Sequence, residues 1–175
     1  MGVYSKEQQE DKPVSVGNYL KFEEGDNKIR ILEKPITGYE YWVENGNDRK
    51  PVRLKQVPKV MPAEALPAKY GDKIKYFEAF VVWNYAAEKI QIMQLIQVSI
   101  YDKLMDYDTS EDWGDIKQYD VNIKKTTADM TSYDVMALPP TDLSTEIAEA
   151  FAEADVDLEL LFDGKDPFKK DESAE

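Results

Sequence analysis

The amino-acid sequence predicts a mainly β fold, in which short strands form a small barrel with one helix between them. Segments of alternating apolar and polar residues, typical of half-buried strands, recur before Pro139. One segment, 99–107, instead has a helical period, with Ile100 and Leu104 four residues apart. A second helical pattern follows Pro139 and Pro140. Several short strands with one interposed helix suit a small closed barrel.

The strand pattern is strongest where aromatic and β-branched residues are densest, in 75–85. Turn compositions at 44–48 and 86–88 join neighbouring strands as hairpins. The predicted strands are 28–32, 39–43, 49–57, 75–85, 89–96, 119–125 and 131–138. Five of them, with the helix before the last pair, fit an OB-type five-stranded barrel with an extra hairpin. A flatter α+β sheet is the alternative.

The chain divides into a barrel domain with appendages. Residues 1–16 are polar and predict a flexible N-terminal arm, and 17–140 form the barrel domain. Residues 141–162 predict a C-terminal helical segment, with Thr141 as the helix N-cap. Residues 163–175 predict a disordered acidic tail.

The composition argues against an enzyme. The chain has no cysteine and no histidine, which removes disulfides, thiolate zinc sites and the commonest general base. It contains no P-loop, dinucleotide-binding glycine pattern or nucleophile elbow. The acids around Trp113 lack the spacing of an EF-hand. We therefore expect no catalytic residues, no metal and no cofactor. Without a secretory signal or a membrane-length apolar run, we expect a cytoplasmic protein.

The charge is distributed unevenly along the chain. The net charge is −13, and 139–175 hold twelve acidic residues and three lysines, a net of −9. By contrast, 27–59 carry eight basic and four acidic residues, a net of +4. A basic segment in an acidic protein with a very acidic end indicates a partner or a contact of the chain with itself. A merely solvated surface is the alternative.

Basic and aromatic residues are interleaved in the same part of the chain. Binding of single-stranded nucleic acid needs cations beside the phosphates and flat side chains on which bases stack. Alternation divides the side chains of 75–85 between two faces, and either face could bind nucleic acid. Phe80 and Val82, and equally Trp83, could instead be core residues that do not contact a ligand. The candidate nucleic-acid-binding residues are Lys28, Arg30, Lys34, Tyr39, Tyr41, Trp42, Arg49, Lys50, Arg53, Lys55, Phe77, Trp83 and Tyr85.

Several of these segments resemble the phage single-stranded DNA-binding proteins, the helix-destabilising type with an OB fold. The similar stretches are GDNKIRIL (25–32), GYEYW (38–42), FVVWNY (80–85), IQIMQL (90–95), SIYDKL (99–104), Trp113-Gly114-Asp115, 119–125 and 133–140. The resemblance covers about residues 17–140. Asp166-Pro167-Phe168 is similar to the acidic, phenylalanine-containing tips of such proteins, but it is not terminal and Lys169-Lys170 follow it. Some members of that family carry a zinc knuckle, but this chain has no cysteine or histidine to ligate the zinc.

The resemblance implies a protein that coats and protects single-stranded DNA during phage DNA replication, recombination and repair, without sequence specificity. It also implies an acidic tail that regulates binding and contacts replication or recombination proteins, in the cytoplasm of the host cell if the chain is phage-encoded. It leaves room for cooperative self-association on DNA, and no membrane partner is expected. An acidic interaction protein, or a DNA mimic that binds host proteins, is the alternative.

Overall fold

The computed structural model describes residues 17–69 and 71–168, so the predicted N-terminal arm lies outside the described residues. Seven antiparallel strands form one sheet, and the prediction of a mainly β fold is confirmed. The strands are β1 (Gly25–Ile31), β2 (Ile36–Asn45), β3 (Asp48–Leu54), β4 (Lys75–Asn84), β5 (Lys89–Leu95), β6 (Tyr119–Thr126) and β7 (Ser132–Pro140). The helices are α2 (Val98–Thr109), α3 (Thr145–Ala154) and two short 3₁₀ helices, η1 (Ile116–Gln118) and η2 (Leu158–Asp163).

The sheet runs in the order β3-β2-β4-β1-β6-β7, and β5 also pairs with β4. β2 pairs with the first half of β4 and β1 with its second half, because the chain bends at Pro35 between β1 and β2. Among the described residues no ladder joins β5 to β7, so the sheet is open, and α2 packs against both strands. Residues 18–20 pair instead with β5, where the Leu20 N–H donates to the Ile92 carbonyl at 2.9 Å.

Two expectations about the end of the sheet are corrected. The prolines do not stop it, since β7 continues to Pro140, which lies opposite Tyr119. β7 is an edge strand, and proline is tolerated there because its missing N–H can lie on the side that has no neighbouring strand. The following helix begins at Thr145 and not after Thr141, because the Ser144 hydroxyl accepts a hydrogen bond from the Ile147 N–H at 3.2 Å.

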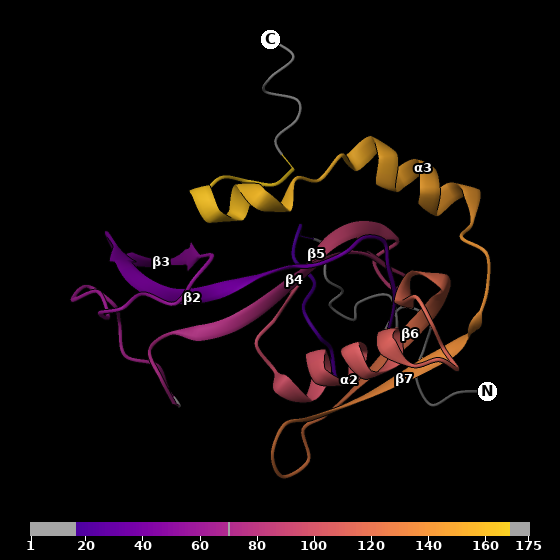
Figure 1. Ribbon diagram of the computed structural model, residues 1–175, viewed down its shortest axis with the longest axis horizontal. Coiled ribbons are helices and arrows are strands. Elements are labelled where there is room, and N and C mark those ends of the chain that lie inside the picture. Colours follow the sequence, from indigo (N-terminus) through magenta and orange to yellow (C-terminus); the bar gives the residue numbers. More distant parts are fainter. Residues whose placement is uncertain (1–16, 70, 169–175) are drawn as a thin grey trace, which may run out of the picture.

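The two faces of the sheet carry separate cores (Figure 1). On one face, Phe80 and Val82 of β4 pack with α2 and with the inward residues of β1, β6 and β7. On the opposite face, Phe77 and Trp83 of β4 lie beneath α3 and η2. β4 is therefore buried on both sides, from Phe77 to Asn84.

The C-terminal segment, residues 145–168, forms the cover over this second face. Ile147, Leu158 and Leu161 are its fully buried anchors, and Phe162 packs at a centroid distance of 6.3 Å on Phe77. Gly38 admits the close approach, since a Cβ there would lie 2.9 Å from the Phe162 ring. The residues after η2 are also placed: Gly164 ends the helix, and Phe168 packs against the same core. The rest of the predicted disordered tail, 169–175, lies outside the described residues.

No helix in the described part of the chain is long and apolar enough to span a membrane.

Candidate nucleic-acid interface

The β2–β3 hairpin and the C-terminal segment enclose a groove of about 990 Å³. Trp42, Lys50 and Arg53 line it from the hairpin, and Tyr19 lines it from the strand-like segment beside β5. Residues 161–167 form its remaining wall. The groove thus brings together the middle of the predicted basic and aromatic hairpin with two segments that are distant in sequence.

Trp42 is the most exposed of the predicted aromatic residues, at 41%. Its neighbours Tyr41 and Val43 are 6% and 9% exposed, because alternation along β2 turns them toward a small core beneath the hairpin. Tyr19, at 38% exposed, supplies a second ring to the groove. Two large, half-exposed rings in one groove are unusual on a surface that needs none for packing, and they suit stacking.

Arg53 lies in the groove floor with its charge balanced. Its Nε donates to Glu40 Oε2 at 3.0 Å and to Gln94 Oε1 at 3.1 Å. Gln94 Nε2 donates to the same Glu40 oxygen at 2.6 Å. With side-chain exposures of 11% for Arg53 and 7% for Glu40, this is a partly buried ion pair that orders the hairpin against β5. Burial raises the pKa of Tyr19, while the nearby charge of Arg53 lowers it.

Lys50 is the exposed cation that lines the groove, and Arg49 is its neighbour on β3. Arg49 and Lys50 are exposed, and no described acid lies within ion-pair distance of either. Lys55 is also exposed, but its Nζ lies 3.2 Å from Glu159 Oε1 and 5.4 Å from the centroid of the Phe162 ring. The C-terminal segment therefore already contacts one predicted phosphate-binding lysine.

Three predicted aromatic residues are packing residues in this structure. Phe77 is 0% exposed and Trp83 is 5% exposed, both beneath the C-terminal segment. Tyr41, at 6%, belongs to the core under the hairpin. None of these rings can stack on a base while the segments above them stay in place.

Lys28, Arg30 and Tyr85 gather around Asp120 of β6, away from the groove. Arg30 is 2% exposed, and its guanidinium donates to Asp120 Oδ1 at 3.3 Å and to the backbone carbonyls of Lys117 and Thr141 at 2.8 Å each. The Tyr85 hydroxyl donates to the same carboxylate at 2.7 Å. Burial, followed by this hydrogen bond, raises the pKa of Tyr85 to about 12. Arg30 is thus engaged within the fold by its guanidinium and does not line the groove.

Two further predicted residues lie on the other side of the sheet. Tyr39 packs edge-on against Tyr76 at a centroid distance of 5.8 Å. Lys34 is exposed at the mouth of a second cavity. The lining of the groove thus contains Trp42, Lys50 and Arg53 of the predicted residues. Lys55 contacts Phe162 of its wall, and the other nine predicted residues are outside it.

Tyr19 was missed at the level of sequence. Its place depends on the pairing of Asn18 and Leu20 with Ile92, a contact across more than seventy residues that no local pattern indicates. Within the described ranges no group of three or more potential metal-ligating side chains is found.

Comparisons of this chain with protein-family models, with curated proteins and with solved structures found no significant match.

Proposed function

We propose that this protein binds single-stranded DNA without sequence specificity, as a coat during phage DNA replication, recombination and repair, and that it has no catalytic activity. The observation that carries the proposal is that two exposed rings, Trp42 and Tyr19, line one groove together with the exposed cation Lys50. Flat rings hold the bases and exposed cations follow the phosphates, which needs no base-reading element.

The strand connectivity supports an OB-type fold for this role. β1 pairs with β4 and β6, β4 with β5, and β6 with β7, and the helix α2 lies between β5 and β6. These pairings are those expected of an OB fold except that no described ladder closes β5 onto β7. In that fold the face of the second and third strands and the loop between the first and second bind oligonucleotides. The β2–β3 hairpin, with Trp42, is inserted in that loop.

We further propose that the acidic C-terminal segment competes with DNA for this groove. Asp163 and Asp166 belong to its lining residues, and Glu159 holds Lys55. A tethered anionic segment reaches an effective concentration of about millimolar order, so DNA must displace at least its edge. A displaced segment becomes available to a basic replication or recombination protein.

Titration with oligo(dT) tests the proposal. We expect Trp42→Ala to weaken binding by about 1–3 kcal/mol, roughly 5- to 150-fold in Kd, while Trp42→Phe keeps most of the affinity because a flat ring remains. Lys50→Ala should lower the slope of log affinity against log salt by about 0.7, the value for one phosphate contact on a single strand. Lys103→Ala, an exposed lysine on α2, is the matched control and should leave the slope unchanged.

Thermal melting of each variant separates lost binding from lost folding. Unchanged affinity in a folded Trp42→Ala variant would remove Trp42 from the site. A wild-type protein that binds no oligo(dT) at low salt would overturn the function and favour an acidic interaction protein instead.

A further inference from the structure

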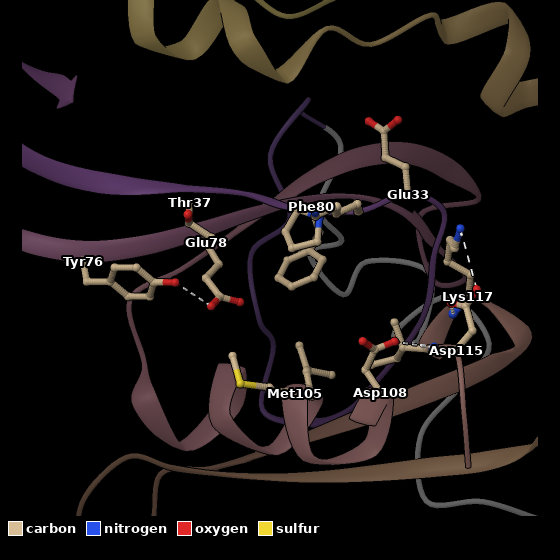
Figure 2. A pocket seen from close by; sticks show the side chains of 13 residues that line it. Glu33, Thr37, Tyr76, Glu78, Phe80, Met105, Asp108, Asp115 and Lys117 are labelled. Carbon is tan, nitrogen blue, oxygen red and sulfur yellow. Dashed lines mark hydrogen bonds and ion pairs between the residues drawn. The ribbon is translucent and has the colours of Figure 1, made fainter. Parts of the chain in front are cut away.

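A second cavity, of about 670 Å³, lies on the opposite face of β4 from the groove. Tyr76, Glu78 and Phe80 line it from β4, and the chain between β1 and β2, helix α2 and η1 complete its walls (Figure 2). Alternation along β4 separates these residues from Phe77 and Ala79, which face the C-terminal segment. The cavity is thus independent of the groove and of its cover.

The inner surface of the cavity is apolar. Phe80, Leu104 and Ile116 are 4%, 2% and 7% exposed, and they belong to the main core. Met105 lies at the rim of α2 with 53% exposure, and in Figure 2 its side chain lies beside the hollow. Because these three core residues are already almost fully out of water, the apolar surface that a ligand could still cover is that of Met105.

One polar group in the cavity lacks a partner of opposite charge. Glu78 is 5% exposed, and the Tyr76 hydroxyl donates to its Oε2 at 2.8 Å. No described residue donates to its Oε1, and no described lysine or arginine lies within ion-pair distance. Burial raises the pKa of Glu78, and the charge that raises it further belongs to another acid, Asp102. A carboxylate in this position, with one hydrogen bond and no cation, would gain charge-assisted hydrogen bonds from a cationic ligand.

A second carboxylate faces Glu78 across the hollow. Asp108 projects from α2, and its Oδ1 accepts a hydrogen bond from the Ile116 N–H at 2.9 Å (Figure 2). The lysine on that wall, Lys117, is engaged by Asp115 at 3.7 Å. Glu33 also lines the cavity, but its carboxylate turns away toward the C-terminal segment. The charges that β4 and α2 place beside the hollow are therefore both negative, and the exposed Lys34 lies at its mouth.

We infer that this cavity binds an arginine side chain, presented by a basic segment of a partner protein. The planar guanidinium has five donors, enough to serve carboxylates on opposite walls. The aliphatic stem lies along the exposed Met105. The exposed residues at the mouth, among them Thr37 and Asp115, leave room for the backbone of the segment to stay outside. A polyanion such as DNA is disfavoured by the same two carboxylates.

Methyl NMR of the full chain labelled at methionine tests this inference without relying on DNA binding. The probe is N-acetyl-L-arginine methylamide, and the matched uncharged probe is N-acetyl-L-citrulline methylamide, which has nearly the same shape. We expect the Met105 methyl signal to shift saturably with the arginine probe and not with the citrulline probe. Met130 and Met136, exposed on the β6–β7 hairpin, should not shift in parallel.

Variants assign the charge that is responsible. Glu78→Gln should weaken the arginine probe about tenfold or more, as expected for the loss of a charge-assisted hydrogen bond. Glu149→Gln makes the same charge change on the exposed surface of α3 and should have no effect. A blocked pentapeptide with a central arginine and four glycines should bind at least as tightly as the single residue.

Four results would overturn the inference. Equal binding of the citrulline probe would show that charge is not recognised, and equal loss in Glu149→Gln would show only general attraction to an acidic protein. An unchanged Kd in Glu78→Gln would remove that carboxylate from the site. Exclusion of the peptide, with the single residue still bound, would mean that the cavity takes a free small molecule and not a protein segment.

Discussion

Replacement of Leu161 by alanine measures how firmly the C-terminal segment is docked on the sheet. Leu161 is 2% exposed, and the floor beneath it includes Phe77, Ala79 and Val81, all 0% exposed. A core leucine-to-alanine change costs about 2–5 kcal/mol, with the larger values where neighbours cannot close the space. Because a paired strand cannot move into the vacated volume, we expect about 3–5 kcal/mol for the docked state.

The measured loss of stability in Leu161→Ala cannot exceed the free energy with which the segment docks on the sheet. A larger local loss makes the segment detach while the sheet stays folded. Ordering each residue of the segment costs about 1–2 kcal/mol, which offsets most of the gain from its buried side chains. The Lys55–Glu159 pair adds little because both side chains are exposed, at 67% and 59%. We therefore expect Leu161→Ala to release the segment locally, and not to unfold the protein.

Amide hydrogen exchange followed by mass spectrometry distinguishes these outcomes. Protection within 145–163 should fall about 100-fold or more, while protection in β1, β4 and β6 changes little. Leu143→Ala is the matched control, because Leu143 is 37% exposed and precedes α3, and its effect should stay within about 0.5 kcal/mol. Unchanged protection of 145–163 in Leu161→Ala, or an equal loss throughout the sheet, would refute the reasoning.

Two further predictions concern buried charges. Arg30→Ala should lower the free energy of unfolding by about 3–5 kcal/mol, because it leaves Asp120 buried without its main cation, and urea denaturation would reveal the loss; a loss below 1 kcal/mol would contradict the structural role. Glu78→Gln should gain stability relative to the wild type as pH rises from about 4.5. The pKa of Glu78 is raised in the folded state, so the folded wild type keeps its proton to higher pH than the unfolded chain does. The wild type therefore loses stability as pH rises through that pKa, whereas the glutamine of the variant does not titrate. Urea midpoints of both proteins at pH 4 and pH 7 check the sign, and a difference that is constant or opposite would exclude a raised pKa.

The strands could be predicted from the sequence because alternation is a local property. Segments such as 89–96 and 119–125 have one clearly apolar face, and both became strands close to those limits. The pairing of residues 18–20 with β5 could not be predicted, because it depends on which edge of the sheet remains free after the other strands have paired. The position of α3 on the sheet face depends in the same way on tertiary packing.

The candidate site could be predicted only in part, for a related reason. Trp42 alternates with Tyr41 and Val43 in a strand with one exposed face, so its exposure follows from the pattern. Phe77 and Trp83 lie in β4, which is apolar on both faces, and alternation then cannot say which face is covered. Arg30 looked like a surface cation because its charge partner is ninety residues away, in β6.

The positions of the groove and the second cavity determine which ligands can be bound together. The C-terminal segment and single-stranded DNA would need the same side of the sheet, since Lys55 and the groove wall already belong to the segment. The Glu78 cavity opens on the other side, and β4 itself, buried on both faces, separates the two sites. Close packing on both faces of this strand leaves no path by which one ligand could touch the other. A basic partner in the cavity and DNA in the groove, as proposed, would therefore be sterically compatible, whereas DNA and the docked C-terminal segment would compete.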